Sequence, residues 1–538
     1  MASHLILPPS GERIINANGR DVTREVYEPI RKAWGQIGDP GDPAEIRKAG
    51  EVVTTAANLV AINLEAPAKN LYPVLTPLRN ALPRSTKSVG AGLAAQWREV
   101  TSIAGASALP ASPWLREGQR GPRMSIVTAD KSATYVTIGL DTDVTFEAQS
   151  AAAGFEDEYA MSGLRLLQQV MILEEDALLG GNRDVALGVT ATPTLSASGT
   201  GTLPNATYSV RVFALTHEGY RNWQQAGASY VTGIYRQVTL TGADAQTYVV
   251  NGGSSGAGTA ATQATTGVQN LNCSVTAIKG AVAYAWYVGT AGSERLALIS
   301  TINSAVFSAP LAGTGQTLAS VASPGTDYSF NNGTGGNNAP AFNGLLYASF
   351  NSASAINIRL ATGTAGTGTV LTASGRGTIT EIDTILKQLW DNFRISPDVI
   401  YVSAQEIVNI AAKIYGGTTN GTLRYSVTLN PEGTIQAGIG AIEYINLLGN
   451  AANGKPTIPL KVHPTLVPGT MMFWVQNLPA QYQSANVPMV AQVECRRDYY
   501  QIPWPQVTRR QETGVYAEEV LKVYAPWAVA TLSNIANG

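Results

Sequence analysis

The sequence predicts an α+β protein with an all-β sandwich inserted into it, and three patterns support this prediction. Residues 136–146 alternate apolar and polar side chains, as in a strand with one buried face. Residues 155–179 repeat apolar side chains at helical spacing, which predicts a helix roughly 38 Å long at 1.5 Å per residue. Residues 185–325 contain short alternating segments between glycine and serine turns, a spacing typical of a β-sandwich.

The strand and the long helix together form an extended region that cannot bury its own apolar side. One parity of the strand carries Val136, Ile138, Leu140, Val144 and Phe146. A hairpin that leads into a bare helix offers only one apolar face from each element. We therefore expect another part of the chain, or another copy of it, to cover both.

The last turns of this helix carry Glu174, Glu175 and Asp176, where negative charge opposes the helix macrodipole. One interpretation is a solvated acidic face. The other is an acidic strip that faces basic groups of another subunit.

Composition narrows the classes of function. Charged residues make up 14% of the chain, well below the roughly 25% of ordinary soluble domains, and this favours surfaces that meet other protein. A net charge of −2 excludes a globally basic nucleic-acid binder. We expect the basic pair Arg496 and Arg497 to face solvent or another subunit rather than to read DNA.

Cysteine content and hydropathy add two expectations. The only two cysteines, Cys273 and Cys495, do not form a disulfide framework, and we interpret both as small buried apolar groups. A disulfide between them or a reactive thiol remains an alternative. An apolar start at residues 5–7 is stopped by prolines, and no stretch approaches 18 apolar residues, so we expect neither a signal peptide nor a membrane span.

The N-terminal region reads as an arm rather than a domain. Helices are expected at 22–34 and 44–64. Prolines interrupt the apolar segment 72–84, so we expect it to lie extended, as neither a helix nor a central strand. A short strand is expected at 97–100.

The C-terminal half reads as a compact unit of helices and strands. Thr378 and Glu381 form a capping-box pattern before a helix that reaches Phe393, and Ser403 with Glu406 begins another helix. Strands are expected at 399–402, 439–447, 470–475 and 489–494, with a closing strand region at 515–532.

No catalytic constellation is visible in the sequence. His4, His217 and His463 are isolated, and no histidine or cysteine spacing suits a metal ion. No phosphate-binding loop or nucleophile elbow occurs. We therefore predict a protein that is not an enzyme, with no catalytic, cofactor-binding or metal-binding residues.

The order of these elements resembles the major capsid protein of tailed double-stranded DNA bacteriophages, a coat fold shared with encapsulins. Residues 342–346 (Phe-Asn-Gly-Leu-Leu) are similar to the family's Phe-Asp-Gly-Leu segment, with Asn343 in place of aspartate, and residues 523–528 are similar to its closing segment. The resemblance implies seven regions: an N-terminal arm (1–115), an extended β-hairpin loop (116–154), a peripheral domain with its spine helix (155–188), an inserted immunoglobulin-like or fibronectin-like sandwich (189–325), a second peripheral part (326–402), an axial domain (403–500) and a C-terminal return to the peripheral domain (501–538).

This resemblance implies a coat protein that assembles as pentamers and hexamers into an icosahedral shell around double-stranded DNA. It implies a virion protein assembled in the host cytoplasm, with non-specific DNA contact and possible scaffold, portal and decoration proteins as partners, and no membrane. Family members cross-link the loop covalently in some cases, and Lys131 is the lysine of this loop, although an ordinary ion pair is the alternative. We expect the sandwich to project outward and to be dispensable for shell closure.

Two other functions remain open. One is an encapsulin-like cargo shell of the same fold. The other is an exported immunoglobulin-like adhesin or glycan-binding surface protein, which an N-terminus without an export signal does not favour.

Overall fold

The computed structural model describes residues 75–86, 92–102, 114–120, 127–152, 157–225, 233–333, 339–374, 377–416, 428–429, 435–436, 443–446, 448, 456–478, 488–506 and 508–538. Its contacts divide the chain into two compact units. Unit 1 comprises Met1–Ala95, Ala133–Glu175 and Val493–Val520, and unit 2 comprises Gln96–Ser132, Asp176–Gln492 and Leu521–Gly538. The helices expected at 22–34 and 44–64 lie outside the described residues.

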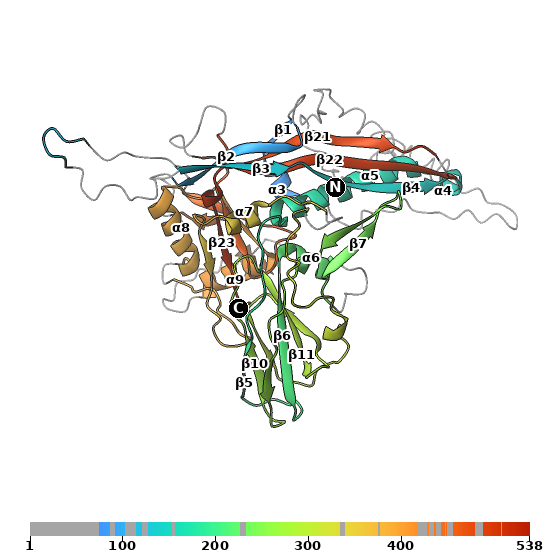
Figure 1. The fold of residues 1–538 in the computed structure, drawn as a ribbon. Helices are drawn as coiled ribbons and strands as arrows, with labels where there is room; N and C mark the ends of the chain where they lie inside the picture. The colour runs from blue at the N-terminus through green and yellow to red at the C-terminus, as the bar shows by residue number, and fades with distance from the viewer. Residues whose placement is uncertain are drawn as a thin grey trace. The chain divides into compact units, whose positions relative to one another are not determined.

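Unit 1 is built on a four-stranded sheet that one long helix covers (Figure 1). The strand order is β1 (Arg84–Thr86), β21 (Ala491–Pro503), β22 (Arg510–Val523) and β4 (Val136–Thr145). The helix is α5 (Glu158–Gly180), and its apolar side chains pack on β21 and β22 in a buried cluster. This cluster contains Leu164, Leu166, Leu167, Val170, Tyr499, Val515 and Ala517.

The alternating strand and the long helix predicted from the sequence are both confirmed. The strand ends at Thr145 rather than at Phe146, which begins the short helix α4 (Phe146–Ala152). Its partner is β22, with Leu140 opposite Val515 in an antiparallel register. A segment more than 360 residues away in the sequence therefore covers one edge of the strand.

The proline-broken segment 72–84 is not extended throughout, so that prediction is wrong. It contains the helix α3 (Pro77–Ala81), with Pro77 at the start of the helix. Proline is tolerated there because the first helical N–H groups have no partner within the helix. The strand β1 follows at the edge of the sheet, parallel to β21.

A separate two-stranded ribbon precedes β4 in the chain. It pairs β2 (Ala94–Ser102), which confirms the strand expected at 97–100, with β3 (Val127–Thr134). Within unit 2, the indole of Trp97 donates to the carbonyl of Val523 at 3.0 Å, and the Val100 N–H donates to the Tyr524 carbonyl at 3.0 Å. These bonds hold β2 against the end of β22.

Unit 2 contains a mixed six-stranded sheet with three helices. The strand order is β14 (Asn357–Arg359), β23 (Val529–Ser533), β20 (Met471–Trp474), β15 (Val399–Val402), β19 (Thr457–Val462) and β18 (Glu443–Ile445). The helices are α7 (Leu345–Asn351), α8 (Thr380–Phe393) and α9 (Ala404–Gly416). All four residues of β15 are buried, as predicted for a central strand.

Of the two helix N-caps predicted from the sequence, one is formed. Ser403 caps α9, because its hydroxyl accepts the Glu406 N–H at 3.2 Å. The capping box of Thr378 and Glu381 is not formed. The Thr378 hydroxyl instead donates to Asp383 at 2.7 Å, while Glu381 accepts the Thr372 N–H at 2.9 Å.

The inserted segment forms a sandwich of two sheets within unit 2. One sheet has the order β13 (Ser304–Phe307), β10 (Asn270–Ser274) and β5 (Thr194–Ser198), and the other β12 (Arg295–Ser300), β11 (Ala283–Thr290), β6 (Thr207–Leu215) and β9 (Ala261–Ala264). Their inner faces share a buried core around Trp286, which is fully buried. A two-sheet sandwich is confirmed, but the strand order is not the ABED and CFG order of immunoglobulin domains.

The two central strands of the second sheet, β6 and β11, are buried on both of their faces. The outer face of this sheet carries Phe213, Ala285 and Tyr287, which pack in one cluster with Tyr347 of α7 and with Val467. The insertion therefore shares a hydrophobic core with the rest of unit 2. The other described elements are α6 (His217–Gln225), β7 (Gln237–Thr241), β8 (Thr247–Asn251), η1 (Leu318–Ser320), β16 (Thr428–Leu429), β17 (Ile435–Gln436) and η2 (Pro526–Ala528).

Candidate functional site: a buried charge cluster and exposed apolar side chains

Two of the three acidic residues at the end of α5 are buried inside the chain. Glu174 and Glu175 are each 1% exposed, so the expectation of an acidic strip on a solvent face or facing another subunit is wrong for both. The groups that donate to these two carboxylates belong to the same chain, and a buried carboxylate needs such donors. Asp176 is partly buried in unit 2, where it pairs with Arg221 at 3.5 Å.

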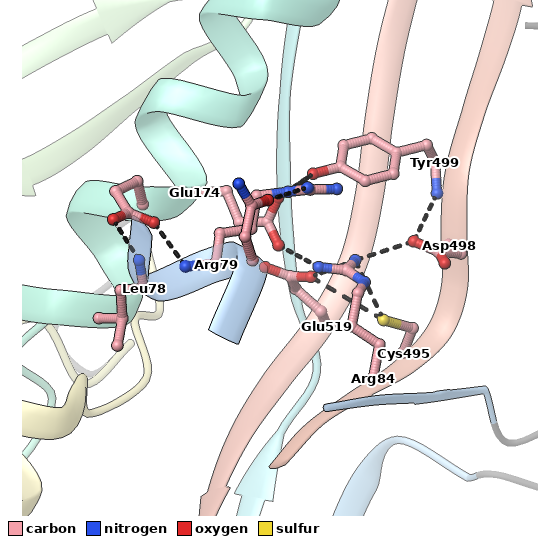
Figure 2. A network of polar contacts seen from close by, with 10 residues as sticks. Leu78, Arg79, Arg84, Glu174, Cys495, Asp498, Tyr499 and Glu519 are labelled. Atoms are coloured by element: carbon pink, nitrogen blue, oxygen red, sulfur yellow. Dashed lines mark hydrogen bonds and ion pairs between the residues drawn. The ribbon is translucent and has the colours of Figure 1, made fainter. Parts of the chain in front are cut away.

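Figure 2 shows the polar side chains that surround Glu174. The Arg79 Nε donates to this carboxylate at 2.9 Å, and the Arg84 guanidinium and the Tyr499 hydroxyl also donate to it. Arg84 reaches two further carboxylates, Asp498 at 2.8 Å and Glu519 at 3.0 Å. The guanidinium of Arg84 therefore joins α5, β21 and β22 through a residue of β1.

Burial and charge act in opposite directions on these groups. Burial alone would raise the pKa of Glu174, but Arg84 and Arg79 hold it below its ordinary value. Burial would likewise lower the pKa of Arg84, yet Glu174, Cys495, Glu519 and Asp498 together raise it well above its ordinary value. Both groups are therefore charged at neutral pH, and Glu174 depends on Arg84 because its own carboxylate is almost completely buried.

Glu175 serves a different purpose in the same place. Its two carboxylate oxygens accept the backbone N–H groups of Leu78 at 2.9 Å and Arg79 at 2.7 Å. These are N–H groups of the first turn of α3, which have no acceptor within the helix. Glu174 and Glu175 thus fix the side chains and the backbone of the same short segment.

The other residues proposed for subunit contact also interact with residues of their own chain. Arg496 pairs with Glu518 at 2.6 Å, and its guanidinium lies 5.6 Å from the ring centre of Tyr135. Arg497 is exposed and lies over the ring of Tyr500. In unit 2, Lys131 is partly exposed, with Glu99 at 3.8 Å, a long ion pair.

Within unit 2, the Phe-Asn-Gly-Leu-Leu segment forms hydrogen bonds with the residues that follow α5. The Asn343 side-chain oxygen accepts the N–H groups of Arg183 at 2.8 Å and Asp184 at 3.2 Å, and its amide donates to the Asp184 carboxylate at 2.6 Å. The Gly344 N–H donates to the Gly181 carbonyl at 2.8 Å. An amide suits this position better than a carboxylate, because a carboxylate would repel Asp184.

Replacing Gly344 with alanine is expected to lower the free energy of unfolding of unit 2 by about 1–3 kcal/mol. A Cβ at this position would lie 2.7 Å from the backbone of Leu179 and 2.8 Å from the carbonyl oxygen of Ala177, and backbone cannot move aside cheaply. The matched control is Gly163→Ala in α5, where no atom lies within 4 Å of the new Cβ. That variant is expected to gain about 0.5–1 kcal/mol. Urea unfolding of both proteins measures the difference, and an equal response of the two variants would contradict the packing argument.

Both cysteines are free and buried, as the sequence analysis expected. Cys273 lies in the sandwich core, where burial raises the pKa of its thiol to about 12. Cys495 lies in the charge cluster, where its sulfur accepts a hydrogen bond from Arg84 at 3.4 Å. A buried thiol with a raised pKa is a poor nucleophile.

The described residues contain no cluster of histidine, cysteine, aspartate or glutamate that could hold a metal ion. His217 is buried, with its Nε2 atom 2.9 Å from the Thr465 carbonyl oxygen, and burial lowers its pKa to about 4. Such a histidine is a neutral packing group. In the part of the chain that the structure describes, no helix is both long and apolar enough to cross a membrane.

Large apolar side chains are exposed at and next to the β2–β3 ribbon. Leu93 is 79% exposed, immediately before β2. Trp114 is 85% exposed and Leu115 is 57% exposed, in the part of the chain that connects β2 to β3. Trp114 and Leu115 are adjacent in the chain, so two large apolar side chains are exposed to water at the same place in unit 2.

No family model and no curated protein matches this chain. Matching solved structures include the holo-SrpI encapsulin complex from Synechococcus elongatus PCC 7942 (TM-score 0.33, 7% identity, covering 92% of this chain and 96% of that one). The capsid of the cyanophage P-SCSP1u matches with a TM-score of 0.35, 10% identity and coverage of 91% and 94%. The capsid of an empty GTA particle matches with a TM-score of 0.36, 8% identity and coverage of 91% and 98%.

The two arginines of the cluster were not predicted from the sequence. Arg79 and Arg84 lie in an apolar segment whose prolines indicated only extended backbone. One signal was available. The two arginines are unfavourable in an apolar segment, and the two adjacent glutamates are unfavourable at the C-terminal end of a helix. Their opposite charges indicate that the two segments pair.

Proposed function

We propose that this chain is the major capsid protein of a tailed double-stranded DNA bacteriophage, and that it assembles as pentamers and hexamers into an icosahedral shell. The observation that carries the proposal is the exposure of Trp114 and Leu115, in the described part of the connection between β2 and β3, and of Leu93 just before β2. In a single subunit these side chains meet water, whereas in a closed symmetric shell a neighbouring subunit buries them. The role is structural and needs no catalytic residue.

Two other features support a shell subunit. The pairing of β4 with β22 and the packing of α5 on this sheet give unit 1 a rigid frame. The docking of the Phe-Asn-Gly-Leu-Leu segment on the residues just after the end of α5 joins two distant parts of the chain. A separate scaffold protein, a portal, decoration proteins and non-specific contact with packaged DNA complete the proposal, with assembly in the host cytoplasm and the sandwich on the outer surface.

Replacing Trp114 with glutamate is expected to abolish closed particles while leaving the subunit folded. A charge at the centre of an apolar subunit contact is left without a partner, which costs several kcal/mol for each contact and is repeated around the shell. Negative-stain microscopy and sedimentation of the protein, expressed with its neighbouring genes, measure particle formation, and circular dichroism measures folding. Leu93→Glu is expected to give the same result.

The matched control is Val268→Glu, because Val268 is 67% exposed in the connection between β9 and β10 of the sandwich. This variant is expected to form particles like those of the wild type. Wild-type protein that stays monomeric at every salt and protein concentration would contradict the shell function. Particles that enclose no nuclease-protected DNA would favour a cargo shell instead.

A further inference from the structure

Glu519 is a fully buried carboxyl group in the middle of β22, and charged groups of four other elements face it. Arg79 of α3 and Arg84 of β1 are the cations, and Glu174 of α5 and Asp498 of β21 are the anions. The thiol of Cys495, also on β21, donates to Glu519 at 3.9 Å. The side chain of Glu519 is 0% exposed, so water does not contact its carboxyl group.

One oxygen of Glu519 has too few hydrogen-bond donors for a carboxylate. Its Oε2 atom accepts from Arg84 at 3.0 Å, but within the described residues its Oε1 atom has no hydrogen-bond partner. A buried carboxylate needs donors on both oxygens, whereas a neutral carboxylic acid loses much less without them. The hydrogen bonding therefore suits the protonated form.

The balance of charge leads to the same conclusion. With Glu519 ionised, the two guanidinium groups of Arg79 and Arg84 would face four carboxylates, since Glu175 lies next to Glu174. With Glu519 neutral, three carboxylates remain. Burial and the charge of Glu174 raise the pKa of Glu519 to about 8.

We propose that Glu519 holds a proton in the folded protein at neutral pH. Its neutral form stabilises the packing of α5 on the sheet of unit 1. Loss of the proton to solvent in alkaline conditions leaves a second buried carboxylate against Glu174, and the two repel α5 and β22 from each other. Protonation of Glu519 therefore stabilises the folded state of unit 1. The inference concerns this unit by itself and does not depend on the proposed shell function.

The direction of the pH dependence follows from linkage. An unfolded glutamate ionises near 4.5, while folded Glu519 keeps its proton up to about 8. The stabilisation is complete below pH 4.5 and is lost as the pH rises to 8, because the unfolded chain releases a proton that the folded chain retains. Glu174, whose pKa is lowered, acts only below pH 4.5, and Cys495, whose pKa is raised, acts only above pH 9.

The test is hydrogen–deuterium exchange of the α5 and β22 backbone amides in the full chain between pH 5.5 and 8, corrected for the intrinsic exchange rate. In the wild type, the opening constant of these segments is expected to rise by up to about tenfold per pH unit. In Glu519→Gln, which imitates the neutral acid, it is expected to be nearly constant. The difference between the two proteins removes contributions from titrating groups of unit 2.

The matched control is Glu518→Gln, because Glu518 is the next residue of the same strand and pairs with Arg496 instead of the cluster. This variant is expected to keep the wild-type pH dependence. An equal slope in the wild type and in Glu519→Gln overturns the proposal. If Glu519→Gln does not fold, the wild type alone decides, since an opening constant that does not change from pH 5.5 to 8 also overturns it.

Discussion

Replacing Arg84 with methionine is expected to lower the free energy of unfolding of unit 1 by about 3–5 kcal/mol. The substitution keeps an apolar side chain of similar length but leaves Glu174 and Asp498 without their central cation. Removing one partner from a buried ion pair is costly because the other charge stays in a place without water. Urea unfolding of the unassembled protein, followed by the fluorescence and far-ultraviolet signals, measures the loss.

The matched control is Arg509→Met, also in unit 1. Arg509 pairs with Glu147, but its side chain is 79% exposed and that of Glu147 is 61% exposed. Exposed pairs contribute between 0 and about 1 kcal/mol, so this variant is expected to unfold close to the wild type. If both variants lost the same small amount, the cluster would not be what holds Pro77–Ala81 and β1 in place.

Deleting residues 189–323 behind a short linker is expected to leave the remaining chain insoluble. The deletion removes Phe213, Ala285 and Tyr287 and so exposes the apolar side chains of Tyr347 and Val467 that pack against them. An exposed patch of this kind drives aggregation. This result would reverse the expectation that the sandwich is dispensable, and the soluble fraction after expression measures it.

The control for this deletion is a small change at the far end of a hairpin in the same segment. Residues 242–246 join β7 to β8, are mostly exposed, and can be replaced by an Asn-Gly turn. That variant is expected to stay soluble. A soluble deletion protein with normal exchange protection of α7 would show that the shared core is unnecessary for unit 2.

Local patterns of apolar and polar residues in the sequence predicted several of the elements. Alternation found β4, helical spacing found α5 and α8, and an unbroken apolar run found β15. These signals are strong because a buried face imposes its own period on the chain. The cap of α9 by Ser403 was visible for the same local reason.

Pairing between distant segments was not predictable in the same way. Nothing near β4 in the sequence indicates that its partner is β22, because the paired residues, such as Thr145 and Arg510, are at least 365 positions apart and become neighbours only through the fold. Whether Glu174 is buried or exposed depends on Arg84, its distant partner. Arg84 lies in a segment whose prolines had indicated only extended backbone. The strand order of the sandwich is likewise a property of the whole topology rather than of any one strand.

The burial of β6 and β11 on both faces has a consequence for how the sandwich can be used. A domain joined by a linker swings, whereas a layer wedged between two apolar cores keeps one orientation. A peptide inserted at the β11–β12 turn, where Gly292 has open space around it, would inherit that fixed orientation. If copies of the chain form a symmetric lattice, such peptides would stand at regular spacing and in one common attitude, which is the geometry that multivalent receptors and antibodies bind most strongly.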